Sequence, residues 1–343
     1  MTTAILERPR PAEQKPAETP LLRVRDLVTE FKTHAGWLRA VNEVSFDLSR
    51  GRILAVLGES GSGKSAVMRT ILGIQPDSAR IAGSIVMDGT ELLGLTRKQR
   101  EQLRGNQMSM VFQDPMNALD PLFTVRQQIV ETLRRHLKLS RAAAGDRALE
   151  LLNLVQIPSP ERRLDAYPFE LSGGMRQRIM IAMALACEPQ LLLADEPTTA
   201  LDVTVQARVL GLLAELRDRL GMTVIIVTHD LAVAAQIADD VAVMYAGRIV
   251  ETGSVHDIVE RPQHPYTLGL LGANVRPGQS GRPFAIPGSP PNLADVPPGC
   301  AFAPRCARQV DACWEQHPPL RYAGNGHRAA CVQLENTDPG VPA

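Results

Sequence analysis

A glycine-rich stretch has the residue types and the spacing needed to hold phosphate groups. The octapeptide GESGSGKS matches the pattern G-x-x-x-x-G-K-[ST]. Glycines let backbone N–H groups approach phosphate oxygens, because no Cβ stands in the way. In this pattern the lysine reaches the β- and γ-phosphates, and the last hydroxyl ligates Mg²⁺. The predicted nucleotide contacts are Gly58, Glu59, Ser60, Gly61, Ser62, Gly63, Lys64, Ser65 and Ala66.

Two carboxylates further along the chain could supply hydrolytic chemistry. The apolar run LLLADE ends in Asp195 and Glu196. Asp195 suits the shell of a magnesium ion, directly or through water. Glu196 suits a general base that orients and activates the attacking water. Taken alone, an Asp-Glu pair before Pro197 could equally begin a helix, but a phosphate-binding loop beside it favours the catalytic interpretation.

The elements that must position these residues predict an α/β fold with a largely parallel sheet. Several apolar runs lack polar alternation, as expected for strands that are covered on both faces. One run leads into the phosphate loop, and another ends in the two carboxylates. Because parallel strands present their carboxyl ends at one edge, the sheet should bring the two motifs together. The predicted strands are 52–58, 108–113, 190–196, 222–229 and 240–250.

The composition divides the chain into four parts. Residues 1–20 contain four prolines and mixed charges, and we expect a disordered tail without the apolar core of a signal peptide. Residues 21–260 form the catalytic domain, with a helix-rich subdomain at about 93–167. Residues 261–335 begin with a short amphipathic helix and continue through a proline-rich segment. Residues 336–343 form a second tail.

The overall charge narrows the classes of partner. The chain has 37 Lys and Arg residues against 37 Asp and Glu residues, so its net charge is zero. This balance argues against a large surface for nucleic acid or anionic lipid. No apolar run approaches the roughly 18 residues of a membrane-spanning helix. The sequence therefore predicts a cytoplasmic protein that does not bind nucleic acid.

Four more motifs establish a resemblance to a known family. The stretch LSGGMRQR resembles the signature sequence of ATP-binding cassette (ABC) ATPases. Gln113 in VFQDP resembles their Q-loop, Asp202 in ALD their D-loop, and His229 in VTHD their switch histidine. Each match is weak alone, but with the phosphate loop and LLLADE all six occur in the family's order. The resemblance covers about residues 21–250.

The resemblance implies a RecA-like core that carries an antiparallel β subdomain and a helical subdomain. It also implies ATP as the nucleotide and a second ABC ATPase subunit, identical or paralogous, so that two cassettes enclose two ATP molecules. The signature of each cassette then contacts the γ-phosphate held by its partner. Its residues open a helical pattern, and helix N-termini bind anions. They are Ser172, Gly173, Gly174 and Gln177.

The resemblance also assigns roles around the γ-phosphate. His229 would join Glu196 in catalysis by bonding the phosphate and the attacking water. Asp202 would couple the two sites across the dimer. Gln113 would sense Mg²⁺ as a ligand beside Ser65 and Asp195.

An aromatic side chain is needed to stack on the adenine. Family position points to Phe31, which offers a π-face. Trp37 lies in the same region and is a rival, and Phe31 could instead belong to the core.

Two further segments are similar to dipeptide and oligopeptide importers. The stretch 114–125, DPMNALDPLFTV, resembles the part of their Q-loop that receives a coupling helix from a membrane subunit, with Met116, Leu119, Leu122 and Phe123 as apolar contacts. The stretch 261–273 resembles the start of their C-terminal extension. Without the resemblance, the first would be an ordinary loop and the second a structural helix.

The importer resemblance implies a peripheral ATPase subunit on the cytoplasmic face of the inner membrane. Its partners would be the second ATPase subunit, two permeases and, through the complex, a substrate-binding protein. An importer for another small solute, such as a nickel chelate, and a soluble non-transport ABC ATPase are alternatives. A single cassette without sustained heptads favours the transporter.

Four cysteines near the C-terminus form a possible metal centre. Cys300, Cys306, Cys313 and Cys331 have the spacing C-x5-C-x6-C-x17-C. Structural zinc sites usually have C-x2–4-C pairs, which are absent. A cytoplasmic location disfavours disulfides. A [4Fe–4S] cluster needs four thiolates but tolerates varied spacing, so spacing alone leaves the question open.

The family resemblance favours the iron–sulfur cluster. Peptide-importer ATPases often end in patterns similar to GCAFAPRCARQVDAC and HRAAC, and some carry a [4Fe–4S] cluster there. This implies a structural cluster, with zinc as the alternative and redox sensing as a bolder hypothesis. Arg305, Arg308 and Arg328 could stabilise its charge or simply be solvated. His327 could be a ligand, although a place at the surface or beside a ligand is favoured, and we expect Cys187 as a buried apolar residue.

Overall fold

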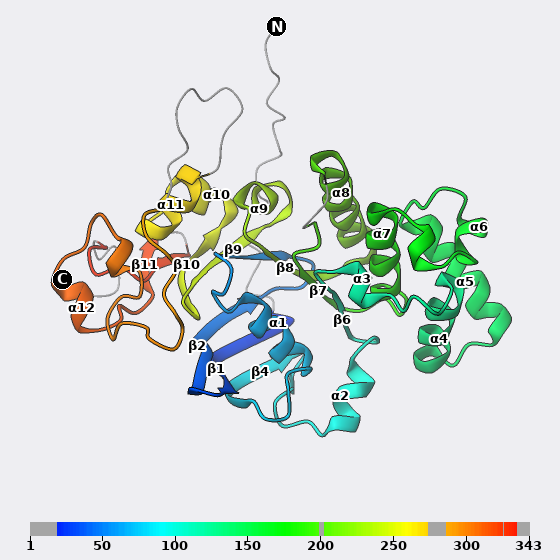
Figure 1. Cartoon of the computed structure of the whole chain (residues 1–343), viewed down its shortest axis with the longest axis horizontal. Helices are drawn as coiled ribbons and strands as arrows, with labels where there is room; N and C mark the ends of the chain where they lie inside the picture. Colours follow the sequence, from blue (N-terminus) through cyan, green and yellow to red (C-terminus); the bar gives the residue numbers. More distant parts are fainter. Residues whose placement is uncertain (1–18, 199–201, 274–285, 325, 335–343) are drawn as a thin grey trace, which may run out of the picture.

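The computed structural model describes residues 19–198, 202–273, 286–324 and 326–334 (Figure 1). The two predicted tails, except for residues 19 and 20, lie outside these ranges. Within the described residues, the larger sheet has eight strands in the order β11-β12-β10-β9-β3-β8-β7-β6. The strands from β6 to β9 pair in parallel, which confirms the α/β fold. Their bounds are β3 Ile53–Leu57, β6 Met108–Val111, β7 Leu191–Asp195, β8 Thr223–Thr228, β9 Asp240–Tyr245, β10 Arg248–Ser254, β11 Arg321–Gly324 and β12 His327–Ala329.

A smaller antiparallel sheet covers one face of the parallel strands. Its order is β2-β1-β4-β5, with β1 Leu22–Thr33, β2 Gly36–Leu48, β4 Arg80–Met87 and β5 Thr90–Glu91. Leu54 and Val56 of β3 pack into the core beneath this sheet, whereas Ile53, Ala55 and Leu57 face the opposite core. Alternation along a strand thus divides a wholly apolar run between two cores, which explains its lack of polar positions.

Helices complete both sides of the large sheet. Helix α1 lies between the two sheets, and α3 to α7 form a group at the right of Figure 1. The bounds are α1 Lys64–Leu72, α2 Arg97–Leu103, α3 Pro115–Ala118, α4 Val125–Leu137, α5 Arg141–Leu154, α6 Pro160–Leu164, α7 Gly173–Ala184, α8 Val203–Leu220, α9 Leu231–Ile237, α10 Val255–Glu260, α11 Pro265–Ala273 and α12 Ala312–Glu315, with 3₁₀ turns at Pro168–Glu170 and Ala303–Arg305. None of these helices, among the residues described, is both long and apolar enough to cross a membrane.

The helical group differs from its predicted bounds of 93–167. Strand β6 falls inside those bounds but pairs with β7 in the large sheet. Helix α7 begins after them and packs against α3, α4 and α5. Sequence periodicity identifies helices, whereas membership of a subdomain depends on packing that the periodicity does not encode.

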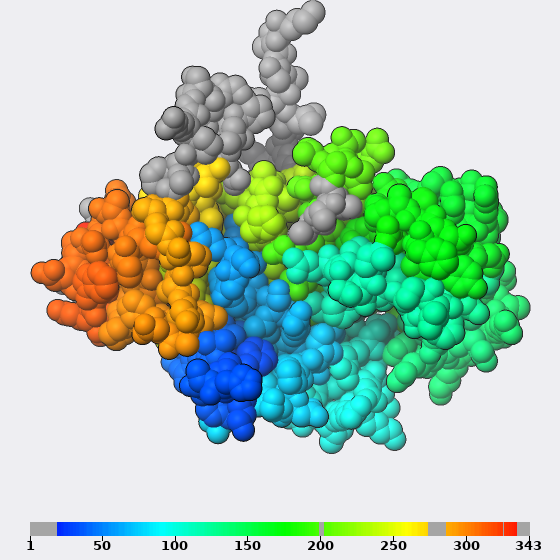
Figure 2. Space-filling view, in the orientation of Figure 1, coloured from blue at the N-terminus to red at the C-terminus, as the bar shows by residue number. Residues whose placement is uncertain are grey.

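The C-terminal extension is partly ordered as sheet. Strand β12 pairs with β10 through Glu251 and Ala329, and β11 pairs with β12. The extension therefore continues the large sheet at the end opposite the helical group. Figure 2 shows it, in orange, packed directly against the blue N-terminal part of the molecule.

Candidate active site

Four neighbouring parallel strands place the predicted catalytic residues at one edge of the sheet. Strand β3 runs into the phosphate loop, and β7 ends at Asp195. Strand β8 ends immediately before His229, and β6 ends two residues before Gln113. Because β3, β8, β7 and β6 are adjacent and parallel, all four ends meet. The predicted motifs therefore form one site.

The phosphate loop is held in a conformation that requires glycine. Gly63 has a φ of 100°, and a Cβ there would lie 2.3 Å from the carbonyl oxygen of Ala40. Lys64 is 4% exposed, and its Nζ donates 2.8 Å hydrogen bonds to the carbonyl oxygens of Gly58 and Glu59. Burial lowers the pKa of the Lys64 ammonium. The loop thus curls around a cation, which suits it to phosphate binding.

Ser65 and Asp195 offer oxygen ligands beside the loop. The Ser65 hydroxyl donates a 2.9 Å hydrogen bond to Asp195 Oδ1. Asp195 is 3% exposed, and burial raises the pKa of its carboxyl, while the bond from Ser65 opposes that change. Mg²⁺ prefers one or two such protein ligands together with phosphate oxygens. The donor set therefore fits a magnesium ion that arrives with a nucleotide.

Glu196 is held by two of the other predicted residues. Gln113 Nε2 donates a 3.1 Å hydrogen bond to Glu196 Oε2, and His229 Nδ1 lies 3.5 Å from the same oxygen. The Glu196 backbone has a φ of 46° and donates its N–H to the carbonyl of Val227 at 3.0 Å. The two neighbouring carboxylates thus have different partners, since Asp195 meets Ser65 while Glu196 meets Gln113 and His229.

The signature residues lie at the start of α7 and not at the phosphate loop. Ser172 caps α7 by accepting a 3.3 Å hydrogen bond from the N–H of Met175. Gly173 and Gly174 form the first turn of that helix. Figure 1 shows α7 within the helical group, apart from α1 and the phosphate loop. Gln177 is 2% exposed, and its amide nitrogen has no hydrogen-bond partner among the described residues.

Asp202 of the predicted D-loop begins α8. Its carboxylate accepts a 2.9 Å hydrogen bond from the N–H of Val205. Ala200 and Leu201, the rest of that motif, lie outside the described residues.

The two candidate adenine-stacking residues lie on the hairpin of β1 and β2. Phe31 is half-buried and pairs with Leu38 across the hairpin. Trp37 is 40% exposed, and the Arg80 guanidinium lies 3.7 Å from its ring centroid. The arginine covers one face of the Trp37 ring.

Two residues of the C-terminal extension reach the phosphate loop, and the sequence did not predict either contact. The hydroxyl of Tyr266 accepts a 2.8 Å hydrogen bond from the N–H of Glu59. The Arg305 guanidinium donates to both carboxylate oxygens of Glu59, at 2.8 and 3.1 Å. Tyr266 was expected in a structural helix, and Arg305 near a metal cluster or in solvent. Contacts between residues more than 200 positions apart leave no local signal.

The four predicted metal ligands line one small cavity. Cys300, Cys306, Cys313 and Cys331 surround it, together with His264. Burial raises the pKa of the Cys300 thiol to about 11, and it also raises the pKa of Cys306 and Cys331. Considering only the residues described, no three His, Cys, Asp or Glu side chains are close enough to hold a metal ion. The four thiols are thus gathered around one cavity.

The burial of the other residues discussed with the cysteines agrees only partly with the prediction. His327 is 3% exposed, so its expected surface position is wrong. Its Nε2 lies 2.7 Å from Glu251 Oε1, which strand pairing between β12 and β10 makes possible. Arg308 and Arg328 are exposed, and Cys187 is buried, as expected.

The predicted contact surface for a membrane subunit is largely exposed. Leu122 is 78% exposed, Met116 53% and Phe123 49%. Leu119 is only 3% exposed, so its expected place on that surface is wrong. It belongs instead to the hydrophobic core that also contains Val125.

Two protein-family models match this chain, one within the ATPase core and one mainly in the C-terminal extension. A model described as "ABC transporter" matches residues 41–199. A second, described as "Oligopeptide/dipeptide transporter, C-terminal region", matches residues 250–313. The second match contains Glu251, Tyr266 and Arg305.

Individual proteins give the same result. The oligopeptide transport ATP-binding protein OppD of Bacillus subtilis is 48% identical over 94% of this chain and 91% of its own length. OppD of Mycobacterium tuberculosis is 48% identical over 92% of this chain, which spans only 52% of that relative. The dimeric ATP-binding cassette MJ0796, solved with ADP and Pi, is 27% identical, with a TM-score of 0.62 over 68% of this chain and 98% of the other.

Proposed function

The chain belongs to the oligopeptide and dipeptide transporter family of ABC ATP-binding proteins, and on that premise we propose that it hydrolyses ATP to drive peptide import. The observation that carries the proposal is the arrangement of Glu196. Its carboxylate meets Gln113 and His229 directly beside the Ser65–Asp195 pair. This is the geometry that a general base for water attack needs.

The chain's own residues divide the work of hydrolysis. Lys64 and the backbone of the phosphate loop bind the β- and γ-phosphates, while Phe31 stacks on the adenine. Ser65, Asp195 and Gln113 would hold the magnesium ion, which would neutralise charge on the phosphates. Glu196 accepts the proton of the attacking water.

His229 orients that water and the γ-phosphate. A histidine 3.5 Å from the base oxygen is within reach of a water that bridges both groups.

A second cassette completes each site. The signature at the start of α7 lies apart from the phosphate loop of the same chain. Ser172, Gly173 and Gly174 therefore act on ATP held by the partner, using a helix N-terminus that favours anions. Asp202 joins the two sites at the interface. Closure of the dimer assembles the site and commits the nucleotide to hydrolysis.

Two permease subunits receive the mechanical output. Met116, Leu122 and Phe123 expose apolar side chains in the segment that follows Gln113, so the chain itself links a contact there to the nucleotide site. The proposal therefore includes a peripheral position on the cytoplasmic face of the membrane. A separate binding protein selects the peptide.

We also propose a structural [4Fe–4S] cluster at the four-cysteine cavity, where Cys300, Cys306, Cys313 and Cys331 would be its ligands. Four thiols around one cavity supply the full ligand set of such a cluster. A single zinc ion needs its four sulfurs only about 3.8 Å apart, as follows from Zn–S bonds near 2.3 Å. The resemblance of GCAFAPRCARQVDAC and HRAAC to the ends of peptide-importer ATPases favours the larger group over zinc.

Purification of the complex from membranes tests the proposed function. The chain should co-purify with two permeases, and the reconstituted complex should couple ATP hydrolysis to peptide uptake into vesicles. Co-purification with DNA or ribosomes, without permeases, would contradict the proposal.

A further inference from the structure

We propose that the C-terminal extension sets the affinity of the phosphate loop for nucleotide by holding Glu59, with Arg305 and Tyr266 as positioning residues. The inference rests on the proposed ATPase function, because it concerns the same nucleotide site. It adds a role for a part of the chain that lies outside the ATPase core.

Glu59 is held at three points. Its N–H donates to the Tyr266 hydroxyl at 2.8 Å, and its carbonyl accepts from Lys64 at 2.8 Å. Its carboxylate meets the Arg305 guanidinium in a two-bond fork. Such forks fix orientation as well as position. One loop residue therefore links the phosphate-binding lysine to two side chains of the extension.

The ion pair is largely shielded from water. The Arg305 side chain is 6% exposed and that of Glu59 is 23% exposed. Pairs that are buried in this way lose less to solvent screening than surface pairs. Loss of one partner would leave a charge without compensation in a poorly hydrated place. The contact is therefore strong enough to influence the loop.

Arg305 is itself firmly placed. Its Nε donates to the carbonyl oxygen of Pro287 at 2.8 Å, and its Nη1 also donates to the Tyr245 hydroxyl at 3.2 Å. Tyr245, Tyr266 and Phe302 pack as an aromatic cluster, with ring centroids 4.6 to 5.4 Å apart. This rigid support delivers the guanidinium to the loop in one orientation.

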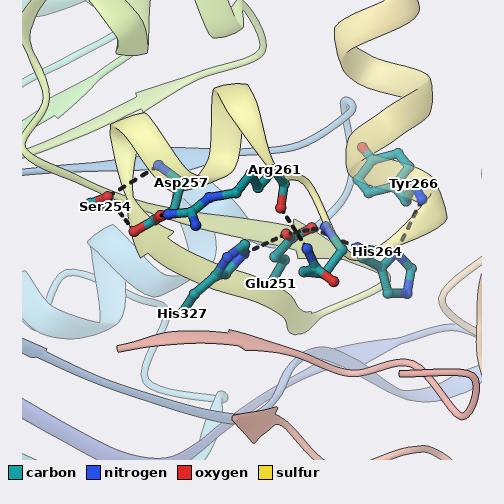
Figure 3. A network of polar contacts seen from close by, with 8 residues as sticks. Glu251, Ser254, Asp257, Arg261, His264, Tyr266 and His327 are labelled. Atoms are coloured by element: carbon teal, nitrogen blue, oxygen red, sulfur yellow. Dashed lines mark hydrogen bonds and ion pairs between the residues drawn. The ribbon is translucent and has the colours of Figure 1, made fainter. Parts of the chain in front are cut away.

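Tyr266 is placed by the polar network in Figure 3. Glu251, fully buried on β10, accepts from the N–H groups of Gln263 and His264 at 2.7 and 2.9 Å, and His327 also contacts it. His264 Nδ1 accepts from the N–H of Tyr266 at 3.1 Å. Burial lowers the pKa of His264 to about 4, so the ring stays neutral and can accept this bond.

Both supports reach the four-cysteine cavity. Arg305 lies between Cys300 and Cys306 in the sequence, while His264 and Phe302 line the cavity itself. His327 lies on β12, just before Cys331. Disorder at the cysteines would therefore loosen both contacts to Glu59.

The test replaces Arg305 in the full chain. Arg305→Gln should weaken binding of a fluorescent ATP analogue with Mg²⁺ by roughly tenfold, because the loop must be reordered by the nucleotide. Hydrogen exchange of the amides from Glu59 to Lys64 should accelerate at the same time. Arg321→Gln removes the same charge from an exposed position of the extension and should change neither measurement. Unchanged affinity and exchange in Arg305→Gln would overturn the proposal.

A double-mutant cycle separates this coupling from general damage. Glu59→Gln should weaken binding similarly, and the double variant should be no worse than either single variant. Additive losses would reject the coupling. Tyr266→Phe removes a single hydroxyl and should give a smaller loss of nucleotide affinity with an unchanged melting temperature. This variant therefore tests the coupling to Glu59 even if Arg305→Gln fails to fold.

Failure of the ATPase proposal is distinguishable from failure of this one. If the ATPase proposal is wrong, Glu196→Gln will hydrolyse ATP at the rate of the unchanged protein. If the role of the extension is wrong, Arg305→Gln will keep its nucleotide affinity and the hydrogen exchange of its phosphate loop.

Discussion

The hydroxyl of Ser65 donates a 2.9 Å hydrogen bond to Asp195 Oδ1, joining the first turn of α1 to the end of β7. The two residues are 130 positions apart in the sequence, and the bond brings together the two side chains proposed as magnesium ligands. It also places an acidic group where water hardly reaches it, since Asp195 is 3% exposed. Burial without a full counter-charge raises the pKa of that carboxyl, so the site is costly to the empty protein.

Asp195→Asn should therefore raise the melting temperature of the nucleotide-free protein. The amide oxygen can still accept from Ser65, while the buried negative charge is removed. The same change should abolish the additional stabilisation given by Mg²⁺ and ATP, because the metal loses a ligand. Thermal melts with and without nucleotide measure both effects. Asp77→Asn, at an exposed position, should alter neither, and a lower melting temperature for the empty Asp195 variant would contradict the argument.

Acid should destabilise the protein through two histidines. Burial lowers the pKa of His264 and of His317 to about 4, from an ordinary value of 6.5. The unfolded chain binds these protons more readily than the folded chain, so the free energy of unfolding should fall as the pH drops from about 6.5 to about 4. For each histidine, a pKa difference of one between the folded and unfolded chain changes the free energy of unfolding by roughly 1.4 kcal/mol.

Denaturant titrations at a series of pH values measure this loss. His264→Asn keeps an acceptor near Tyr266 but cannot gain the proton, so its profile should be flatter across that window. The negative charge of Glu251 beside His264 opposes the lowering of the His264 pKa, but burial has the larger effect. An unchanged slope in His264→Asn would show that this histidine does not control the acid loss.

Much of the site could be predicted because a parallel sheet converts sequence order into position. Each strand of the run from β3 to β6 ends at the same edge, so motifs after apolar runs must meet there. Asp195, Glu196, Gln113 and His229 lie as that rule requires. The fold and the family expected from the sequence are both confirmed.

The rest depended on packing between distant segments. No periodicity places Arg305 on Glu59, because the aromatic cluster and the backbone of Pro287 aim it there. His327 is buried because β12 pairs with β10. Leu119 is buried in the hydrophobic core, although Leu122 and Phe123 of the same segment are exposed. These errors share one cause, since burial of a single side chain is a tertiary property.

The apolar surface next to Gln113 should be needed for assembly. Leu122→Asp should reduce recovery of the permeases in a pull-down at least roughly tenfold, because a charge would be desolvated at the contact. The ATPase rate and the melting temperature of the isolated chain should not change, since Leu122 is 78% exposed. Leu268→Asp, on α11, is the matched control. Normal recovery of permeases with Leu122→Asp would place their contact elsewhere.

The metal content of the extension should be iron rather than zinc. Protein purified without oxygen should be brown and contain about four irons and inorganic sulfides per chain. Cys306→Ser should lose most of the iron, whereas Cys187→Ala should keep it, because Cys187 packs in the core far along the chain from the cavity. One zinc per colourless chain would contradict the cluster.

The role of Glu196 is the central claim, and turnover of Glu196→Gln tests it most directly. The variant should bind Mg²⁺ and ATP with an affinity close to that of the unchanged protein, because the substitution keeps the shape of the site. Its steady-state kcat should fall by roughly 10² to 10⁴, the usual contribution of a general base. Glu215→Gln, at an exposed position on α8, should hydrolyse ATP normally. Hydrolysis by Glu196→Gln at the rate of the unchanged protein would contradict the account.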